Sequence, residues 1–104
     1  MHKNISVEEA RHLMKEKDVV VLDVRLKEDW DREKIRGALN IFFGEYDFDE
    51  QVDELSRHNT YIVYCQVGIG SLKAISIMED LGFDSLYNMS GGIKKWKEMG
   101  YEVK

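Results

Sequence analysis

Short apolar runs alternate with amphipathic segments along this chain. Two of the runs, at residues 19–22 and 61–64, are continuous and consist of β-branched, leucine and aromatic residues. Runs of this kind are typical of strands that are buried on both faces of a sheet. Weaker apolar segments at residues 38–42 and 85–88 predict two further strands.

Between the strands, apolar residues recur at helical spacing. Residues 6–9, Ser-Val-Glu-Glu, form a capping box and predict a helix that runs to about Lys17. Positions 72, 75, 78 and 81 are apolar and predict a helix that starts near Ser71 and ends at Gly82. Three shorter helices are predicted at residues 26–33, at residues 48–55 and after Ser90, which can cap the last one.

Because strands and helices alternate throughout, the pattern predicts an α/β fold with a mostly parallel sheet and helices on its faces. The chain has 104 residues, of which 43% are hydrophobic. This length suffices for one core and is too short for two ordinary domains. We therefore expect residues 1–104 to form a single domain.

Composition and charge exclude several classes of function. No window approaches the roughly 20 apolar residues of a membrane helix, and no apolar signal segment opens the chain, so we expect a cytoplasmic protein. The net charge is −5, and residues 45–54 hold six acids and no base. This charge disfavours nucleic acid and anionic membranes as partners. We interpret the acidic stretch as a solvated loop and first helical turn, with an acidic docking face as the alternative.

Cys65 is the only cysteine, which rules out an internal disulfide. The histidines, at positions 2, 12 and 58, are scattered along the chain. Because no zinc-ligand spacing is present, we expect neither a metal nor an organic cofactor. The thiol is therefore either a buried, unreactive residue of the core or the reactive group of the protein.

The surroundings of Cys65 favour an anion. It follows a predicted buried strand, at the end of the sheet where open α/β folds place their ligands. Gly68 and Gly70 let the backbone curl with its N–H groups inward, and the helix that starts near Ser71 points its positive end at the same space. One interpretation is a thiolate nucleophile with a lowered pKa. The other is a small apolar residue that ends a strand, and position alone does not separate the two.

Five segments carry a wider pattern. They are Asp23-Val24-Arg25, Glu28 with Trp30, residues 35–41, Tyr64-Cys65 with its glycine loop, and residues 88–96. In order and spacing they closely resemble the rhodanese-like family, over essentially the whole chain. The resemblance implies a small central parallel sheet flanked by helices on both faces. It also implies a catalytic Cys65, which takes a sulfane sulfur from a donor, carries it as a persulfide and passes it to a thiophilic acceptor.

The same resemblance implies the binding residues and partners. Backbone N–H groups of the loop would hold the anionic terminal sulfur as an oxyanion hole holds oxygen. The partners would be a small sulfur donor, either thiosulfate or a persulfide, and a thiol acceptor that is a small molecule or a protein. We expect a monomer or a weak dimer. The implied substrate-binding residues are Gln66, Val67, Gly68, Ile69, Gly70 and Ser71.

The loop departs from the family pattern at two positions. Gln66 and Gly70 stand where the family often has arginines, and their loss should weaken the binding of dianionic thiosulfate more than that of a persulfide. Cys65 to Gly70 makes the six-residue loop of the sulfur-transferring members, whereas the related dual-specificity phosphatases have one residue more and a closing arginine. Two alternatives remain: a catalytically weak binding or regulatory module, and a thiol redox switch.

The other motif residues are interpreted as structural. Asp23 and Arg25 are expected to pair with neighbours at a strand end, with Glu28 as a candidate partner of Arg25. The glycines at 91 and 92 predict close packing at a helix start that borders the Cys65 pocket.

Overall fold

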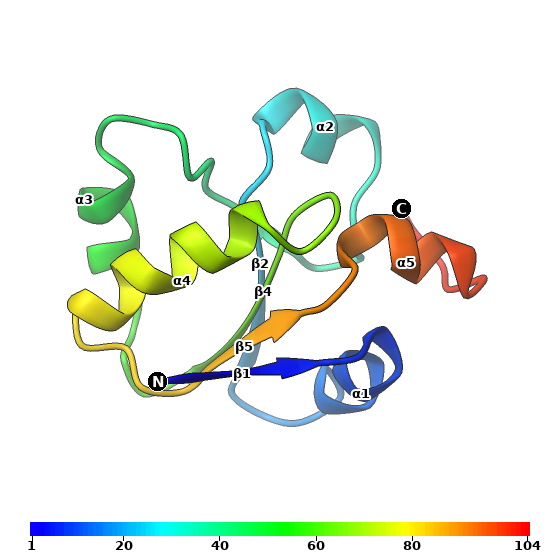
Figure 1. Ribbon diagram of the computed structural model, residues 1–104, viewed down its shortest axis with the longest axis horizontal. Coiled ribbons are helices and arrows are strands. Elements are labelled where there is room, and N and C mark those ends of the chain that lie inside the picture. Colours follow the sequence, from blue (N-terminus) through cyan, green and yellow to red (C-terminus); the bar gives the residue numbers. More distant parts are fainter.

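A computed structural model describes all 104 residues, and its strands and helices alternate along the chain. The strands form one sheet (Figure 1), in which every neighbouring pair is parallel. The elements are β1 (His2–Ile5), α1 (Val7–Leu13), β2 (Val19–Asp23), α2 (Lys27–Arg32), β3 (Leu39–Asn40), α3 (Phe48–Asp53), β4 (Thr60–Tyr64), α4 (Gly70–Asp80), β5 (Leu86–Met89) and α5 (Gly92–Glu98). The strand order across the sheet is β1-β5-β4-β2-β3.

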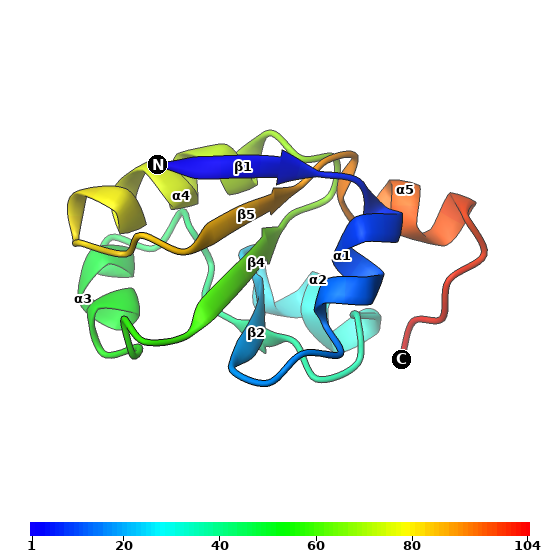
Figure 2. The same ribbon diagram turned by 90° about the horizontal axis from the view of Figure 1, so that it is seen from below.

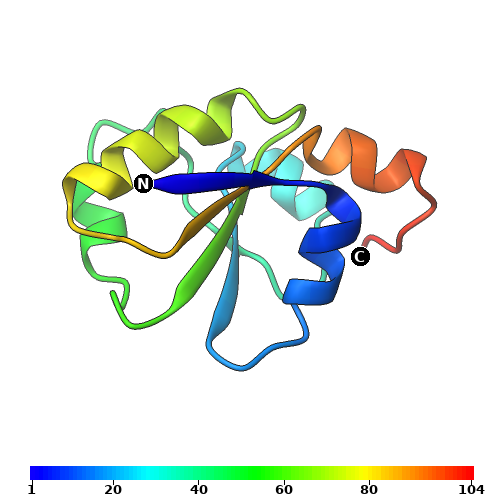
Figure 3. The same ribbon diagram turned by 60° about the horizontal axis from the view of Figure 1, so that its bottom comes forward.

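Helices cover both faces of this sheet. Figures 2 and 3 show α3 and α4 on one side of the strands and α1 and α5 on the other. Along β4, Tyr61 and Val63 join the core beneath α3 and α4, whereas Ile62 and Tyr64 join the core beneath α1 and α5. Because both faces are buried, every position of the strand after Thr60 is apolar or aromatic.

The architecture confirms the predicted α/β fold with helices on both faces of the sheet. Both continuous apolar runs are strands, β2 and β4, and they are neighbours in the middle of the sheet. The segment after Cys65 is the longest helix, α4, with 11 residues. None of the helices combines the length and apolar character required to cross a bilayer.

The edge strand β1 is not predicted by the sequence pattern. Ile5 is its only apolar residue, and the strand pairs with β5 alone, with His2 opposite Leu86 and Ile5 opposite Met89. Backbone hydrogen bonds to one neighbour hold such a strand. A search for apolar runs therefore does not detect it.

Two predicted helix ends are wrong. α1 ends at Leu13 and not near Lys17, because residues 15–18 are all charged and provide no apolar face. The chain then turns at Asp18, whose φ is 65°. Ser90 does not cap α5: the cap position is Gly91, whose φ is 83°, and no side chain caps the helix. A left-handed turn thus leads into α5.

Candidate functional site

Cys65 lies at the start of the connection between β4 and α4. β4 sits between β5 and β2 in the sheet, and Cys65 is the first residue after its carboxyl end. In Figure 1 the connection from β4 to α4 lies between α2 and the start of α5. Only 5% of the Cys65 surface is exposed, and the residue belongs to the core beneath α4. The thiol is therefore largely shielded from water.

Gly68 shapes the loop that follows Cys65. Its φ is 93°, a conformation that other residues adopt only at a cost. A Cβ atom there would also lie 2.9 Å from the backbone nitrogen of Gly91. In this conformation the Gly68 N–H points inward and donates to Cys65 Sγ at 3.1 Å. The loop thus presents an amide donor to the sulfur, as the sequence predicts.

The start of α5 holds the same loop from the other side. The Ile93 N–H donates to the Cys65 carbonyl at 3.0 Å, and the Lys94 N–H donates to the Gln66 carbonyl at 3.1 Å. A Cβ at Gly92 would lie 2.5 Å from each of these two carbonyl oxygens. The predicted close packing at this helix start is therefore present at Gly92, and a helix N-terminus fixes the loop carbonyls. Neither Gly91 nor Gly92 lines the Cys65 pocket, so that part of the prediction is wrong.

The electrostatics around Cys65 favour its thiolate. Burial by itself raises the pKa of the thiol. This effect is outweighed by the Ser71 hydroxyl, 3.4 Å from Sγ, and by the backbone N–H groups of Ser71, Gly68 and Val67, so the net effect is a lowered pKa. The positive end of α4 acts in the same direction. The sulfur thus lies in a turn that favours its anionic form.

Cys65 opens into a pocket of about 290 Å³ with mostly apolar walls. The ring of Phe43 packs on Gly70, so closely that a Cβ atom added at this glycine would lie 3.0 Å from the ring. Val67 is 47% exposed at the mouth. The pocket residues are Arg25, Leu26, Asp29, Phe42, Phe43, Cys65, Gln66, Val67 and Gly70. A larger depression of about 500 Å³, between the starts of α1 and α5, does not include the cysteine.

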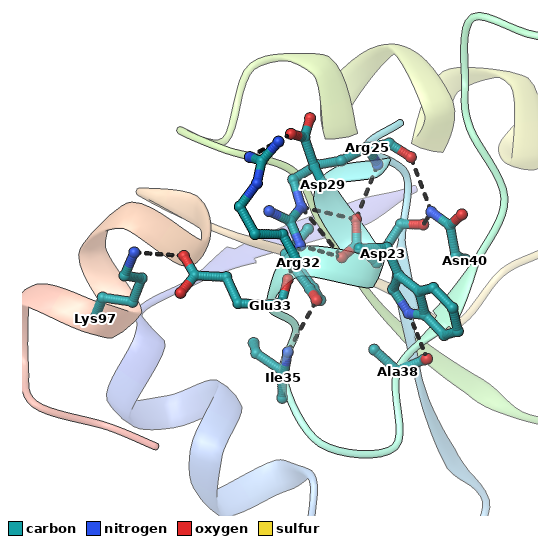
Figure 4. A network of polar contacts seen from close by, with 11 residues as sticks. Asp23, Arg25, Asp29, Arg32, Glu33, Ile35, Ala38, Asn40 and Lys97 are labelled. Atoms are coloured by element: carbon teal, nitrogen blue, oxygen red, sulfur yellow. Dashed lines mark hydrogen bonds and ion pairs between the residues drawn. The ribbon is translucent and has the colours of Figure 1, made fainter. Parts of the chain in front are cut away.

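Arg25 is the only cation that lines this pocket, and it is already paired (Figure 4). Its guanidinium donates to both carboxylate oxygens of Asp23, the shortest distance being 2.7 Å, and to the Glu33 carbonyl at 2.7 Å. Asp23 is fully buried and Arg25 nearly so. Glu28, the candidate partner, does not pair with Arg25. Asp23, two residues earlier at the end of β2, pairs with it instead. The pair ties β2 to the segment after α2.

The predicted loop residues divide into three groups. Gly68 and Ser71 hydrogen-bond to Cys65, and Gln66, Val67 and Gly70 line the pocket. Ile69 does neither and is 65% exposed.

Two further residues at the site are missed by the sequence analysis. Asn88, on β5, accepts a hydrogen bond from Ser71; a polar residue within the apolar segment 86–89 is a signal that could have marked it. Phe43 packs on Gly70 from a distant loop. No local pattern identifies it.

A single cysteine in an amide-lined turn, at the carboxyl end of an open parallel sheet, defines a class of site that holds an anionic group beside a thiol. The model of the Rhodanese-like domain family matches residues 6–99, and the chain belongs to this family. It is 32% identical over 97 residues to thiosulfate sulfurtransferase GlpE of Coxiella burnetii. The aligned region covers 93% of this chain and 89% of that protein.

Other relatives agree with this family. A Mus musculus protein, thiosulfate sulfurtransferase/rhodanese-like domain-containing protein 3, is 30% identical over 113 residues, covering 97% of this chain and 71% of its own. The crystal structure of a rhodanese-related protein from Thermoplasma volcanium superposes with a TM-score of 0.80 at 27% identity, covering 98% and 97% of the two chains. A rhodanese-like domain protein from Staphylococcus aureus gives 0.82 at 27% identity and 98% of both chains.

Proposed function

We propose that this protein is a sulfurtransferase that carries a sulfane sulfur as a persulfide on Cys65. The observation that carries the proposal is the placement of Sγ in a turn whose N–H groups face it, with the Gly68 amide at 3.1 Å. The names of its relatives support sulfur transfer as the reaction.

The reaction has two balanced steps. In the first, the Cys65 thiolate attacks the outer sulfur of the donor; the bond from that sulfur to the donor breaks, and the leaving group departs with the electron pair. The leaving group is sulfite when the donor is thiosulfate, and a sulfinate when the donor is a thiosulfonate. In the second step an acceptor thiolate attacks the outer sulfur of the Cys65 persulfide, and the Cys65 thiolate is released. Loop amides and the positive end of α4 stabilise the charge on the outer sulfur in both steps.

The walls of the pocket favour a donor that carries an organic group. Thiosulfate is a dianion, and the one cation in the pocket, Arg25, is held by Asp23. The Phe43 ring fills the space beside Gly70 that a side chain at this position would need. Burial of an apolar donor group against Phe42 and Phe43 contributes about 25 cal/mol per Å². We infer that organic persulfides or thiosulfonates load Cys65 more readily than thiosulfate does.

Intact mass after incubation with sulfane-sulfur donors tests the carrier role. The wild type is expected to gain about 32 Da that a thiol reductant removes, as a persulfide requires. Cys65→Ala should gain nothing. No addition on the wild type, or the same addition on Cys65→Ala, would exclude Cys65 as the carrier.

A pair of variants tests the donor preference. Loading rates are compared for thiosulfate and for benzenethiosulfonate, a monoanion with an apolar ring. In Phe43→Ala/Gly70→Arg the ratio should shift toward thiosulfate by about tenfold, because a charge-assisted hydrogen bond contributes about 1.5–3 kcal/mol. Gly70→Arg alone should shift it less, because Phe43 still occupies the space. An unchanged ratio in the double variant would refute the proposed role of Phe43.

The second candidate is a binding or regulatory module with little turnover, favoured by the arginine-free positions Gln66 and Gly70. It predicts that donors load Cys65 but that neither small thiols nor protein thiols remove the sulfur. A thiol redox switch predicts a mixed disulfide in place of the persulfide, which the same mass measurement distinguishes. The thiol acceptor, a protein partner, the monomer or weak dimer and the cytoplasmic location stay predictions.

A further inference from the structure

A line of polar side chains runs from Cys65 across the sheet, through buried Ser71 and Asn88 to exposed Asn4. Ser71, on α4, is fully buried and lies with its hydroxyl 3.4 Å from Cys65 Sγ. The same hydroxyl donates to Oδ1 of Asn88, on β5, at 2.5 Å. Asn88 is 3% exposed, and its Nδ2 donates to Oδ1 of Asn4, on β1, at 3.1 Å and to the Gly68 carbonyl at 3.4 Å. The line therefore crosses from α4 through β5 to the edge of the sheet.

The hydroxyl of Ser71 has one proton and two neighbours that can accept it. When Cys65 is a thiol, its S–H donates to Ser71 Oγ, and the Ser71 proton goes to Asn88 Oδ1. When Cys65 is a thiolate, the sulfur becomes an acceptor and competes for that same proton. Donation to the thiolate leaves Asn88 Oδ1 buried without this partner, which has a free-energy cost. Donation by the Ser71 hydroxyl to the thiolate and donation to Asn88 are thus mutually exclusive.

We propose that Asn88 is a positioning residue for Cys65: it holds the Ser71 hydroxyl as an acceptor for the thiol and releases it as a donor when the thiol ionises. The thiol proton leaves to solvent, and the hydroxyl turns about its Cβ–Oγ bond without exchanging its own proton. Asn88 therefore opposes ionisation, whereas Ser71 assists it. Asn88 contacts neither the sulfur donor nor the sulfur acceptor, and it acts on Cys65 through Ser71.

Other charged groups around Cys65 are already neutralised by neighbours. Arg25 and Asp29 are the charged residues that line its pocket, and they pair with Asp23 and Arg32. The contacts that α4, α5 and the loop make with Cys65 come from a hydroxyl and backbone amides. The Ser71 hydroxyl is therefore the one side-chain donor beside the sulfur whose orientation a neighbour controls.

The test is the rate of iodoacetamide alkylation as a function of pH, which reports Cys65 alone because the chain has no other cysteine. Ser71→Ala should raise the midpoint of the profile by about one pH unit, through loss of a hydrogen bond to a charged group. Asn88→Ala should lower it by about 0.5–1 unit, because the competing acceptor is gone. In the Ser71→Ala background, Asn88→Ala should leave the midpoint unchanged.

Two further variants separate this coupling from a loss of structure. Asn88→Leu keeps the branched shape and the number of side-chain heavy atoms, and it should give the same downward shift if Asn88→Ala does not fold. Ser85→Ala removes the hydroxyl pair with Thr60 at the opposite end of β4 and β5, 2.7 Å apart, and should shift nothing. Equal shifts by Asn88→Ala in both backgrounds, or no shift in the wild type by either Asn88 variant, would overturn the proposal.

The inference concerns the ionisation of Cys65 and rests on the proposed function only for its consequence, the supply of thiolate for sulfur transfer. Alkylation needs no sulfur donor. A protein that fails to form a persulfide but shows the predicted shifts would therefore refute the proposed function and leave the role of Asn88 standing.

Discussion

Replacement of Gly92 by alanine tests whether close packing between α5 and the Cys65 loop stabilises the protein. Gly92 has a φ of 62°, and a Cβ there would lie 2.5 Å from the Cys65 and Gln66 carbonyl oxygens. These are backbone atoms, held by the Ile93 and Lys94 amides, so they cannot move aside as a flexible side chain does. The loop and the helix must separate.

The expected cost follows from two contributions. The left-handed backbone costs an alanine about 1–2 kcal/mol, and forcing an extra carbon into a packed site costs about 1–3 kcal/mol. Gly92→Ala should therefore reduce the free energy of unfolding by about 2–5 kcal/mol. The matched control is Gly82→Ala, because Gly82 has a φ of 91° and nothing within 4 Å of its Cβ position. The control should lose about 1–2 kcal/mol, the backbone contribution alone.

Urea unfolding of the wild type and both variants measures the difference, and alkylation of Cys65 reports the loop. Gly92→Ala should lose more stability than Gly82→Ala and should also alkylate with a shifted pH profile, because the loop amides no longer face the sulfur. Gly82→Ala should keep the wild-type profile. Equal losses of stability, or a wild-type profile in Gly92→Ala, would refute the role assigned to this packing.

Two other predictions concern charge. Asp23→Asn leaves Arg25 buried without its carboxylate and should reduce the free energy of unfolding by about 3–5 kcal/mol. The control Asp31→Asn removes an exposed ion pair and should reduce it by less than about 1 kcal/mol. Similar losses for the two variants in urea unfolding would contradict the structural role of the buried pair. The surroundings lower the Cys65 pKa. The alkylation rate of the wild type should therefore rise with pH and reach half its plateau below about pH 8.5, the pKa of a free thiol. A midpoint above this pH would contradict a lowered pKa of Cys65.

The strands other than β1 and the place of Cys65 could be predicted from the sequence because both depend on local pattern. A strand covered on both faces needs apolar residues at every position, and residues 19–22 and 61–64 show this directly. A cysteine after such a strand, followed by glycines and an amphipathic helix, fixes the turn and the direction of the helix dipole. These features require no knowledge of which strands are neighbours.

The partners of the site residues depend on how distant segments pack. β1 is recognised only by its pairing with β5, because a short edge strand gains its stability from one neighbour's backbone. Phe43 covers Gly70 from the loop after β3, and Asn88 meets Ser71 from the next strand along the chain. Periodicity along a sequence reports which face of an element is buried, and it carries no information about which residue lies opposite.

The sequence alone therefore determined the fold class, the place of Cys65 and its amide-rich turn, through burial patterns and glycine positions that act within one element and its connections. Only the tertiary structure decided what surrounds Cys65: the Phe43 ring on Gly70, the Asp23 carboxylate that holds Arg25, and the Asn88 amide behind Ser71. Hydrogen bonds and packing contacts require atoms within about 3–4 Å. Across segments far apart in the chain, such distances are set by the packing of sheet and helices together.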